Sequence, residues 1–236
     1  MTKTLVLLML AAPAAFPVTF NSPWVLPANA NAFALGDFNG DGKPDIAVTN
    51  SGANDTVTIW LQKSGQPFQP AASYAVGNVP NAIAVADFNG DGKLDLAVVN
   101  SGPASRGGNS VSILLGNGDG TFQPQMTVPV GNTPVALAVV DFDGDGTSDL
   151  AVLNHVSNTI SILLGNGDGT FQPAANTPAG TNTFIFAVGD LNGDGLPDLV
   201  LVLGSRVQVL LNKGGGMFQR GADYPVGGLA SGITRI

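Results

Sequence analysis

Short apolar stretches separated by polar, glycine-rich turns run along most of the chain. Four of them are almost wholly apolar five-residue runs, IAVTN, LAVVN, LAVLN and LVLVL, beginning at Ile46, Leu96, Leu150 and Leu199. Such runs are typical of strands covered on both faces. Weaker runs bounded by Gly, Asn and Asp flank each one, as expected for neighbouring strands joined by turns. In the second unit these runs predict strands at 82–87, 94–100, 110–115 and 121–130.

This four-strand pattern repeats in step with two sequence markers. An Asp- and Gly-rich segment of the form DFNGDGKPD begins at Asp37, Asp87, Asp141 and Asp190, at intervals of 50, 54 and 49 residues. A phenylalanine follows the third strand of each unit, at Phe68, Phe122, Phe171 and Phe218. Four-stranded units of this length indicate a β-propeller, whose rings contain about 4 to 8 blades. We predict an all-β repeat domain over 16–236, with blades at approximately 32–76, 82–130, 135–179 and 184–226.

The two ends of this array are out of frame with a closed ring. Residues 16–27 resemble a lone outer strand, whereas residues 218–236 pass through an outer strand into the next inner one. The pattern predicts blades that belong to a larger ring or are open at the ends, with self-association through the open ends. A ring sealed by pairing of the terminal strands is the alternative.

The N-terminal segment is the candidate targeting sequence. Lys3 precedes an apolar run over 5–10, and Ala12-Pro13-Ala14 supplies a small-residue cleavage pattern. These features predict a signal peptide at 1–15 and a secreted or cell-surface protein. The alternative is a degenerate strand of a preceding repeat. Elsewhere, no apolar stretch approaches the roughly 18 to 20 residues that span a bilayer, so membrane insertion is not expected.

Composition removes several functional classes. Only 11% of residues are charged and the formal net charge is −8, so the chain lacks the basic surface that nucleic acids and anionic lipids require. It contains no Cys, which excludes disulfides, thiol catalysis and Cys-ligated zinc. All 17 acidic residues are Asp, and 13 of them fall in the four repeated loops. The loops therefore carry the candidate chemistry.

Each loop gathers oxygen-bearing side chains at positions 1, 3, 5 and 9, with Gly at position 6 for a tight turn. Calcium accepts 6 to 8 oxygen ligands in flexible geometry, whereas magnesium requires a near-ideal octahedron and zinc favours His or Cys. We predict four Ca²⁺ sites, with side-chain ligands at these positions and a backbone carbonyl at position 7. The predicted sets are Asp37, Asn39, Asp41, Lys43 and Asp45; Asp87, Asn89, Asp91, Lys93 and Asp95; Asp141, Asp143, Asp145, Thr147 and Asp149; and Asp190, Asn192, Asp194, Leu196 and Asp198.

An EF-hand and a solvated Asp-Gly turn are the alternative interpretations of these loops. An EF-hand requires Glu at position 12, but this position holds Val48, Val98, Val152 and Leu201 within the apolar runs. Solvated Asp-Gly turns are the simpler alternative, yet they do not explain four copies in register. Thirteen clustered carboxylates would repel one another without a cation, and four Ca²⁺ would bring the formal charge of −8 to zero.

At these residues the chain resembles the FG-GAP/VCBS repeat family, which includes the calcium-binding blades of integrin α-subunit propellers and many bacterial secreted proteins. The resemblance covers roughly residues 16–236. It implies a β-propeller with calcium on one face and roles in adhesion, ligand binding or enzyme support. Typical rings of the family have more blades than the four complete loops found here.

The resemblance and the residues together predict a non-catalytic adhesion or ligand-binding module for a protein or glycan. Structural spacer blades of a larger surface protein are one alternative, and the propeller of a lyase-like carbohydrate-active enzyme is another. The ligand would meet the loops opposite the calcium sites. The most variable of these loops, 101–110, carries Arg106 and Asn109, and it faces Asn54, Asp55, His155 and Arg206 in the equivalent loops. The GNGDG segments at 116–120 and 165–169 are predicted to be hairpin turns without metal.

Overall fold

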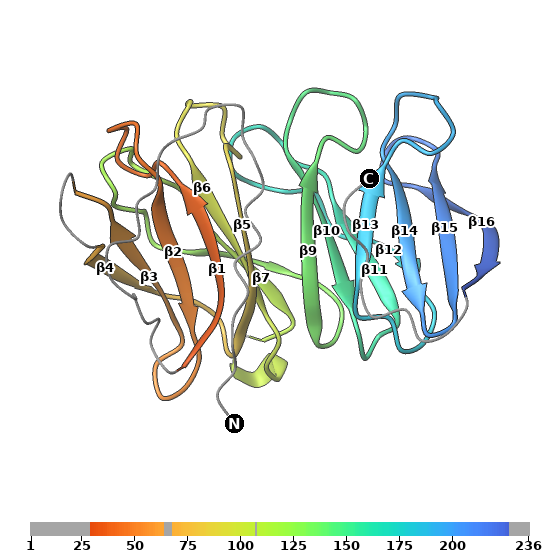
Figure 1. Ribbon diagram of the computed structural model, residues 1–236, viewed down its shortest axis with the longest axis horizontal. Helices are drawn as coiled ribbons and strands as arrows, with labels where there is room; N and C mark the ends of the chain where they lie inside the picture. The colour runs from red at the N-terminus through yellow and green to blue at the C-terminus, as the bar shows by residue number, and fades with distance from the viewer. Residues whose placement is uncertain (1–28, 64–67, 107, 227–236) are drawn as a thin grey trace.

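A computed structural model describes residues 29–63, 68–106 and 108–226 of the chain (Figure 1). These residues form sixteen strands and one short 3₁₀ helix, η1 (Ala104–Arg106). Blade 1 consists of β1 (Ala30–Gly36), β2 (Asp45–Asn50), β3 (Thr56–Leu61) and β4 (Gln69–Ala75), and blade 2 of β5 (Pro80–Ala86), β6 (Asp95–Asn100), β7 (Ser110–Leu114) and β8 (Met126–Pro129). Blade 3 consists of β9 (Pro134–Val140), β10 (Asp149–Asn154), β11 (Thr159–Leu163) and β12 (Ala175–Pro178), and blade 4 of β13 (Phe186–Gly189), β14 (Asp198–Leu203), β15 (Arg206–Asn212) and β16 (Phe218–Pro225).

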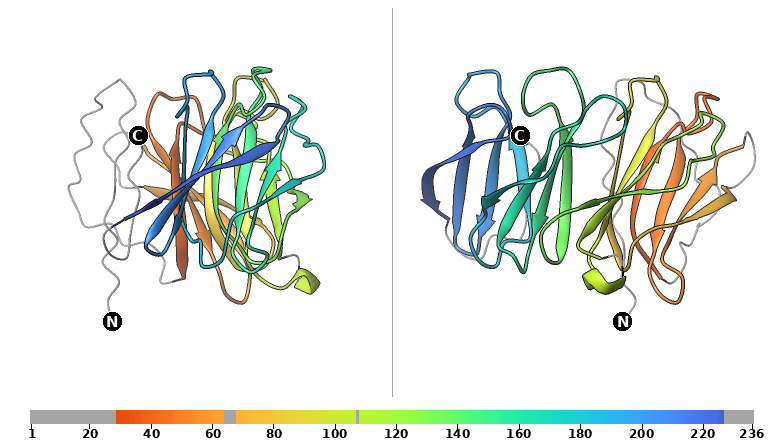
Figure 2. Two further views of the ribbon diagram at one scale, coloured as in Figure 1. Left: turned by 90° about the vertical axis from the view of Figure 1, so that its right-hand side faces the viewer. Right: turned by 180° about the vertical axis from the view of Figure 1, so that it is seen from behind.

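Each blade is an antiparallel sheet whose strands lie in chain order, and the four sheets stand side by side (Figures 1 and 2). The first strands of successive blades, β1, β5, β9 and β13, are neighbours along the array. Blades 1 and 4 lie at opposite sides of the molecule in Figure 1, so the sheets of the described residues do not close into a ring. The predicted all-β propeller blades are confirmed, as an open array.

The second strand of every blade is the centre of the core. All six residues of β2, β6, β10 and β14 are buried, which confirms the prediction drawn from the four apolar runs. Three apolar clusters fill the spaces between successive sheets, and each contains residues from two blades. Each cluster therefore joins one blade to the next.

The fourth strand of blade 2 is shorter than its sequence suggested. The predicted strand covered 121–130, but β8 begins at Met126, and Phe122 instead forms an isolated bridge with Gly116. Pro124 lies between the two segments and has no backbone N–H to give to a ladder. The residues before Pro124 therefore form a turn that is separate from β8, and Phe122 of this turn contacts Phe38 of blade 1.

A buried asparagine links the second and third strands in each of the first three blades. In blade 2, Nδ2 of Asn100 donates to the hydroxyls of Ser110 and Ser112 at 3.0 and 2.9 Å, and Ser112 contacts Gln125 beyond the third strand. Blades 1 and 3 repeat this arrangement with Asn50, Thr56 and Thr58 and with Asn154, Thr159 and Ser161. Blade 4 has Leu203 at the asparagine position.

Removing this buried donor is expected to destabilise the chain. Asn100→Ala should lower the free energy of unfolding by about 1 to 3 kcal/mol, because two buried hydroxyls lose their shared partner. Asn117→Ala is the matched control, since Asn117 donates to the Thr121 hydroxyl at 2.8 Å in an exposed turn. Its expected cost is within about 0.5 kcal/mol. Urea denaturation of both variants measures the difference, and equal midpoints would contradict the buried role.

The predicted signal peptide at 1–15 and the terminal segments at 16–27 and 227–236 lie outside the described residues. Among the residues that are described, no helix has the length and apolar character needed to cross a membrane.

Candidate metal sites

The first Asp of each loop is held by backbone N–H groups of the same loop. In the second loop, Asp87 accepts from Gly90 and Gly92 at 2.7 and 2.8 Å, and in the third loop Asp141 accepts from Gly144 and Gly146 at the same distances. The fourth loop repeats the pattern, and the first uses the N–H of Asp41 with that of Gly42. The glycines at positions 4 and 6 have φ between 71° and 86°, a region that side chains rarely adopt.

Positions 3 and 5 are oriented in the same way. The side-chain oxygens of Asn39, Asn89, Asp143 and Asn192 accept the N–H of the Asp at position 5. That Asp in turn accepts the N–H of the residue at position 7, from Lys43, Lys93, Thr147 and Leu196, at 2.7 to 3.0 Å. The carbonyl of position 7, predicted as a ligand, is not among these contacts and stays a prediction.

The Asp at position 9, a predicted calcium ligand, also accepts hydrogen bonds from backbone N–H groups. Asp45, Asp95, Asp149 and Asp198 are fully buried. In the third loop, one oxygen of Asp149 accepts the N–H of Phe142 and the other accepts the N–H of Gly165, both at 2.7 Å. The other three loops make the same pair of bonds. This Asp therefore fastens the start of its loop to the end of the third strand.

The third loop brings its carboxylates closest together. One oxygen each of Asp141, Asp143 and Asp149 lies within 4.8 Å of the others. This loop carries Asp at position 3, where the other loops carry Asn. Three of the four predicted ligand side chains of this loop thus converge on a hydrogen-bonded backbone frame, and Asp145 is not part of this group.

Burial and hydrogen bonding shift the pKa values of the loop carboxyls in opposite directions. Desolvation raises the pKa of Asp45, Asp95 and Asp149, although two backbone N–H groups oppose the shift in each case. The Lys43 side chain instead lowers the pKa of Asp41 by hydrogen bonding. Its ammonium lies 2.9 Å from Asp41, and the Lys93 ammonium lies 3.2 Å from Asp91.

The chemistry of the donor set fits calcium. Every side-chain ligand predicted is a carboxylate or amide oxygen, and calcium selects hard oxygen donors in flexible numbers. Each carboxylate oxygen has two lone-pair directions, so an oxygen that accepts an N–H can still bind a cation. The lysine ammonium groups at the first two loops also show that a positive charge is accommodated beside position 5.

Comparison with known families tests the repeat itself. A model of FG-GAP-like repeats matches residues 37–98, 87–152, 141–201 and 190–236. The chain belongs to the FG-GAP-like repeat family. Each match begins at the first Asp of a loop and overlaps the next match, so the family model follows the same period as the repeat derived from the sequence. The comparison with curated proteins finds no match.

Solved structures share the fold of this FG-GAP-like chain. A crystal structure of BBS1N in complex with ARL6DN has a TM-score of 0.57 and 16% identity, over 86% of this chain and 55% of its own. A functionally unknown protein from Desulfotomaculum acetoxidans has a TM-score of 0.59 and 19% identity, over 87% of this chain and 62% of its own. An Agrocybe aegerita lectin that recognises non-reducing terminal N-acetylglucosamine has a TM-score of 0.50 and 22% identity, over 81% of this chain and 50% of its own. The chain thus spans 50% to 62% of the length of these structures, and the likeness concerns the fold.

The first three FG-GAP-like loops pack against the following blade through position 2. The Phe38 ring meets Phe122 edge-to-face at 5.6 Å, Phe88 meets Phe171 at 5.6 Å, and Phe142 meets Phe218 at 5.7 Å. The carbonyls of the three loop phenylalanines accept donors from the next blade: Gly120 N–H, Gly169 N–H and the Asn212 side chain. The sequence analysis identified the phenylalanines after the third strands as a marker, but it did not predict that they contact the loop phenylalanines.

The GNGDG segments at 116–120 and 165–169 form turns, as predicted, and the absence of metal from them stays a prediction. Asp119 accepts the N–H and the hydroxyl of Thr121 at 2.9 and 2.6 Å, and Asp168 does the same with Thr170. These bonds lower the pKa of both carboxyls. The turns lie beside the loops of the preceding blade, at the edge opposite η1 (Figure 1).

The opposite face is largely engaged in contacts between FG-GAP-like blades. Asp55 accepts from Asn78 at 2.7 Å, and Asn109 donates to Asn132 at 2.9 Å. The His155 ring stacks on Phe184 with centroids 4.0 Å apart. Asp55, Asn109 and His155, which were predicted to bind ligand there, thus contact a linker to the next blade. Arg206, from the same prediction, pairs with Asp223 of its own blade at 3.4 Å.

Proposed function

We propose that the chain is a calcium-stabilised β-propeller that acts as a secreted or cell-surface, non-catalytic binding module. The convergence of Asp141, Asp143 and Asp149 within 4.8 Å carries this proposal. Three carboxylates at such spacing are unfavourable without a cation, because like charges repel strongly where solvent is partly excluded. The same backbone frame in all four loops supports four sites.

The loops are expected to differ in calcium affinity. Loops 1 and 2 have Lys43 and Lys93 at position 7, and their ammonium groups contact the Asp that calcium would need. Loop 3 has Thr147 there and four Asp in total. A cation at loop 3 displaces no lysine and meets one more negative charge, so we assign this loop the highest affinity.

The described groups outside the loops support a binding role over catalysis. General acid and base catalysis needs a titratable group beside a reacting proton. Asp55, Asp119, Asp168 and Asp223 instead bond to neighbouring side chains or turns, and His155 stacks on a phenylalanine. Adhesion to a protein or glycan is the use that a rigid scaffold with exposed loops serves best.

Calcium titration of two variants tests the assignment of ligands. Asp145→Ala should remove one of four sites by isothermal titration, because position 5 is a predicted side-chain ligand of the loop. Asp119→Ala should leave all four. The two carboxylates have matched surroundings, since each accepts the N–H and the hydroxyl of a Thr two residues later. Equal losses in both variants, or no site in the unmodified chain, would contradict the proposal.

A further inference from the structure

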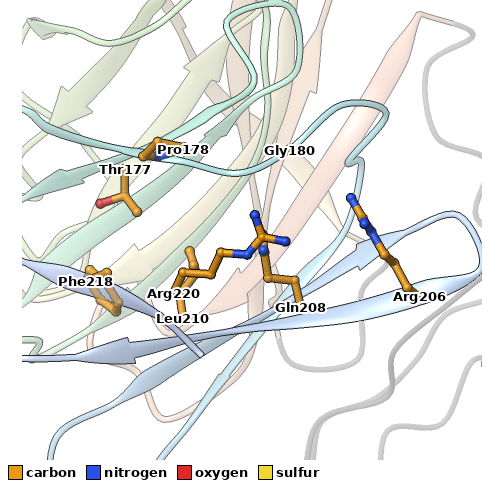
Figure 3. Close-up of a pocket in the computed structure, with 8 residues that line it drawn as sticks. All are labelled: Thr177, Pro178, Gly180, Arg206, Gln208, Leu210, Phe218 and Arg220. Atoms are coloured by element: carbon orange, nitrogen blue, oxygen red, sulfur yellow. The ribbon is translucent and has the colours of Figure 1, made fainter. Parts of the chain in front are cut away.

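A pocket lies between the outer strands of blades 3 and 4 (Figure 3). Its volume is about 440 Å³, within the range of about 300 to 1,000 Å³ that small-molecule sites occupy. Thr177 and Pro178 of β12 form one wall, and Leu210 and Phe218 provide apolar surface on blade 4. Figure 3 shows the guanidinium groups of Arg206 and Arg220 rising from blade 4 toward β12.

The neighbouring groove provides an internal comparison. A pocket of about 420 Å³ between blades 2 and 3 is lined by residues 126–129 and 169–174, and none of these residues is charged. The two grooves are similar in size, so the packing of blades alone explains the space. It does not explain the two arginines.

Both arginines stand where the other repeats carry uncharged residues. The position of Arg206 in the third strand is occupied by Thr56, Ser110 and Thr159, as the strand registers show. Arg220 follows a Phe-Gln pair, and the same pair is followed by Pro in the first three blades, at Pro70, Pro124 and Pro173. Gln208 replaces the hydroxyl residues Thr58, Ser112 and Ser161. Blade 4 has therefore exchanged the hydroxyl links of the other blades for a basic group of side chains.

Asp223 organises this group. One of its oxygens contacts the Arg206 and Arg220 guanidinium groups at 3.4 and 2.7 Å, and the other accepts from the buried Gln208 amide at 3.2 Å. A guanidinium has five N–H donors, and this carboxylate meets one nitrogen of each arginine. The side chains of Arg206 and Arg220 are 51% and 61% exposed, so their remaining donors are accessible from the pocket side.

We propose that this pocket binds a small monoanionic carboxylate. This inference names the ligand class of the binding module and rests on that proposed function. Guanidinium forks match the planar geometry of a carboxylate. Two arginines and one aspartate leave a local charge of +1, which one monoanion neutralises. A dianion would leave excess negative charge on a chain whose formal charge is already −8.

Isothermal titration with glucuronate and phenylacetate tests the inference, with glucose and benzyl alcohol as their uncharged counterparts. The two acids distinguish a hydroxylated from an aromatic carrier of the same carboxylate. At least one acid should bind, its uncharged counterpart should not, and inorganic phosphate should bind more weakly. The acid's affinity should fall at least tenfold in Arg220→Gln and in the double variant Arg206→Thr, Arg220→Gln.

Lys213→Gln is the control, because it removes an exposed positive charge from blade 4 at a residue that does not line the pocket. It should bind the acid as the unmodified chain does. Thermal melts establish that each variant folds. If the double variant does not fold, Arg220→Gln alone carries the test. Absence of acid binding, equal affinity in Arg220→Gln, or tighter phosphate binding would overturn the inference.

Titrations repeated in EDTA separate the two proposals. Calcium stabilisation without acid binding overturns the pocket proposal alone. Acid binding without any calcium effect overturns the calcium-site proposal alone.

Discussion

In millimolar calcium the chain should unfold at a temperature on the order of 10 °C higher than in EDTA. Extracellular calcium modules bind with dissociation constants of roughly 10⁻⁴ to 10⁻³ M, so each occupied loop adds on the order of 1 kcal/mol. Four loops together contribute several kcal/mol, and each kcal/mol raises the melting temperature of a chain this size by about 2 to 4 °C. Calorimetry at several calcium concentrations measures the shift.

Magnesium and zinc serve as controls for this melt. Magnesium at the same concentration should give a smaller shift, because the loops offer flexible oxygen sets rather than a rigid octahedron. Zinc should give little, since His155 is the single His of the sequence and Cys is absent. Coincident curves in calcium and EDTA, or a response to zinc alone, would contradict the calcium assignment.

Phe142→Ala should be among the most damaging single substitutions in the described core. The Phe142 side chain is fully buried and its ring meets Phe218 of the next blade. Removing a buried phenylalanine costs about 3 to 5 kcal/mol, from lost apolar burial and the cavity left behind. The urea midpoint of the variant should fall accordingly.

Leu191→Ala is the matched control for this substitution. Leu191 occupies the same position of the fourth loop but is 41% exposed. Like other surface changes, its loss should alter stability by only about 0.5 kcal/mol. Similar midpoints for the two variants would mean that the loop phenylalanine does not join the blades.

The sequence determines the repeating parts of this fold well. The apolar runs beginning at Ile46 and Leu96 predicted the buried central strands, because strands covered on both faces are mostly apolar. The Asp spacing predicted loops whose side-chain oxygens gather around one point. Positive φ at the loop glycines agrees with the tight turn inferred from Gly at position 6.

Contacts between repeats were harder to predict. Phe142 and Phe218 are both visible as periodic residues, yet periodicity does not tell whether a loop residue packs within its own unit or on the next. The second bond of Asp149, to the N–H of Gly165, was missed because its Asp was already explained as a ligand. Arg220 could have been noticed, since it breaks the Phe-Gln-Pro pattern of the other three repeats.

The phenylalanine contact between blades also gives the array a direction. In the first three loops the phenylalanine contacts the phenylalanine of the blade that follows, so the two faces of a blade are different surfaces. Any copy that docked by repeating this contact would do so head to tail. Such heterologous contacts cannot form a two-fold dimer, and they produce either a ring, if the rotation closes, or an open filament.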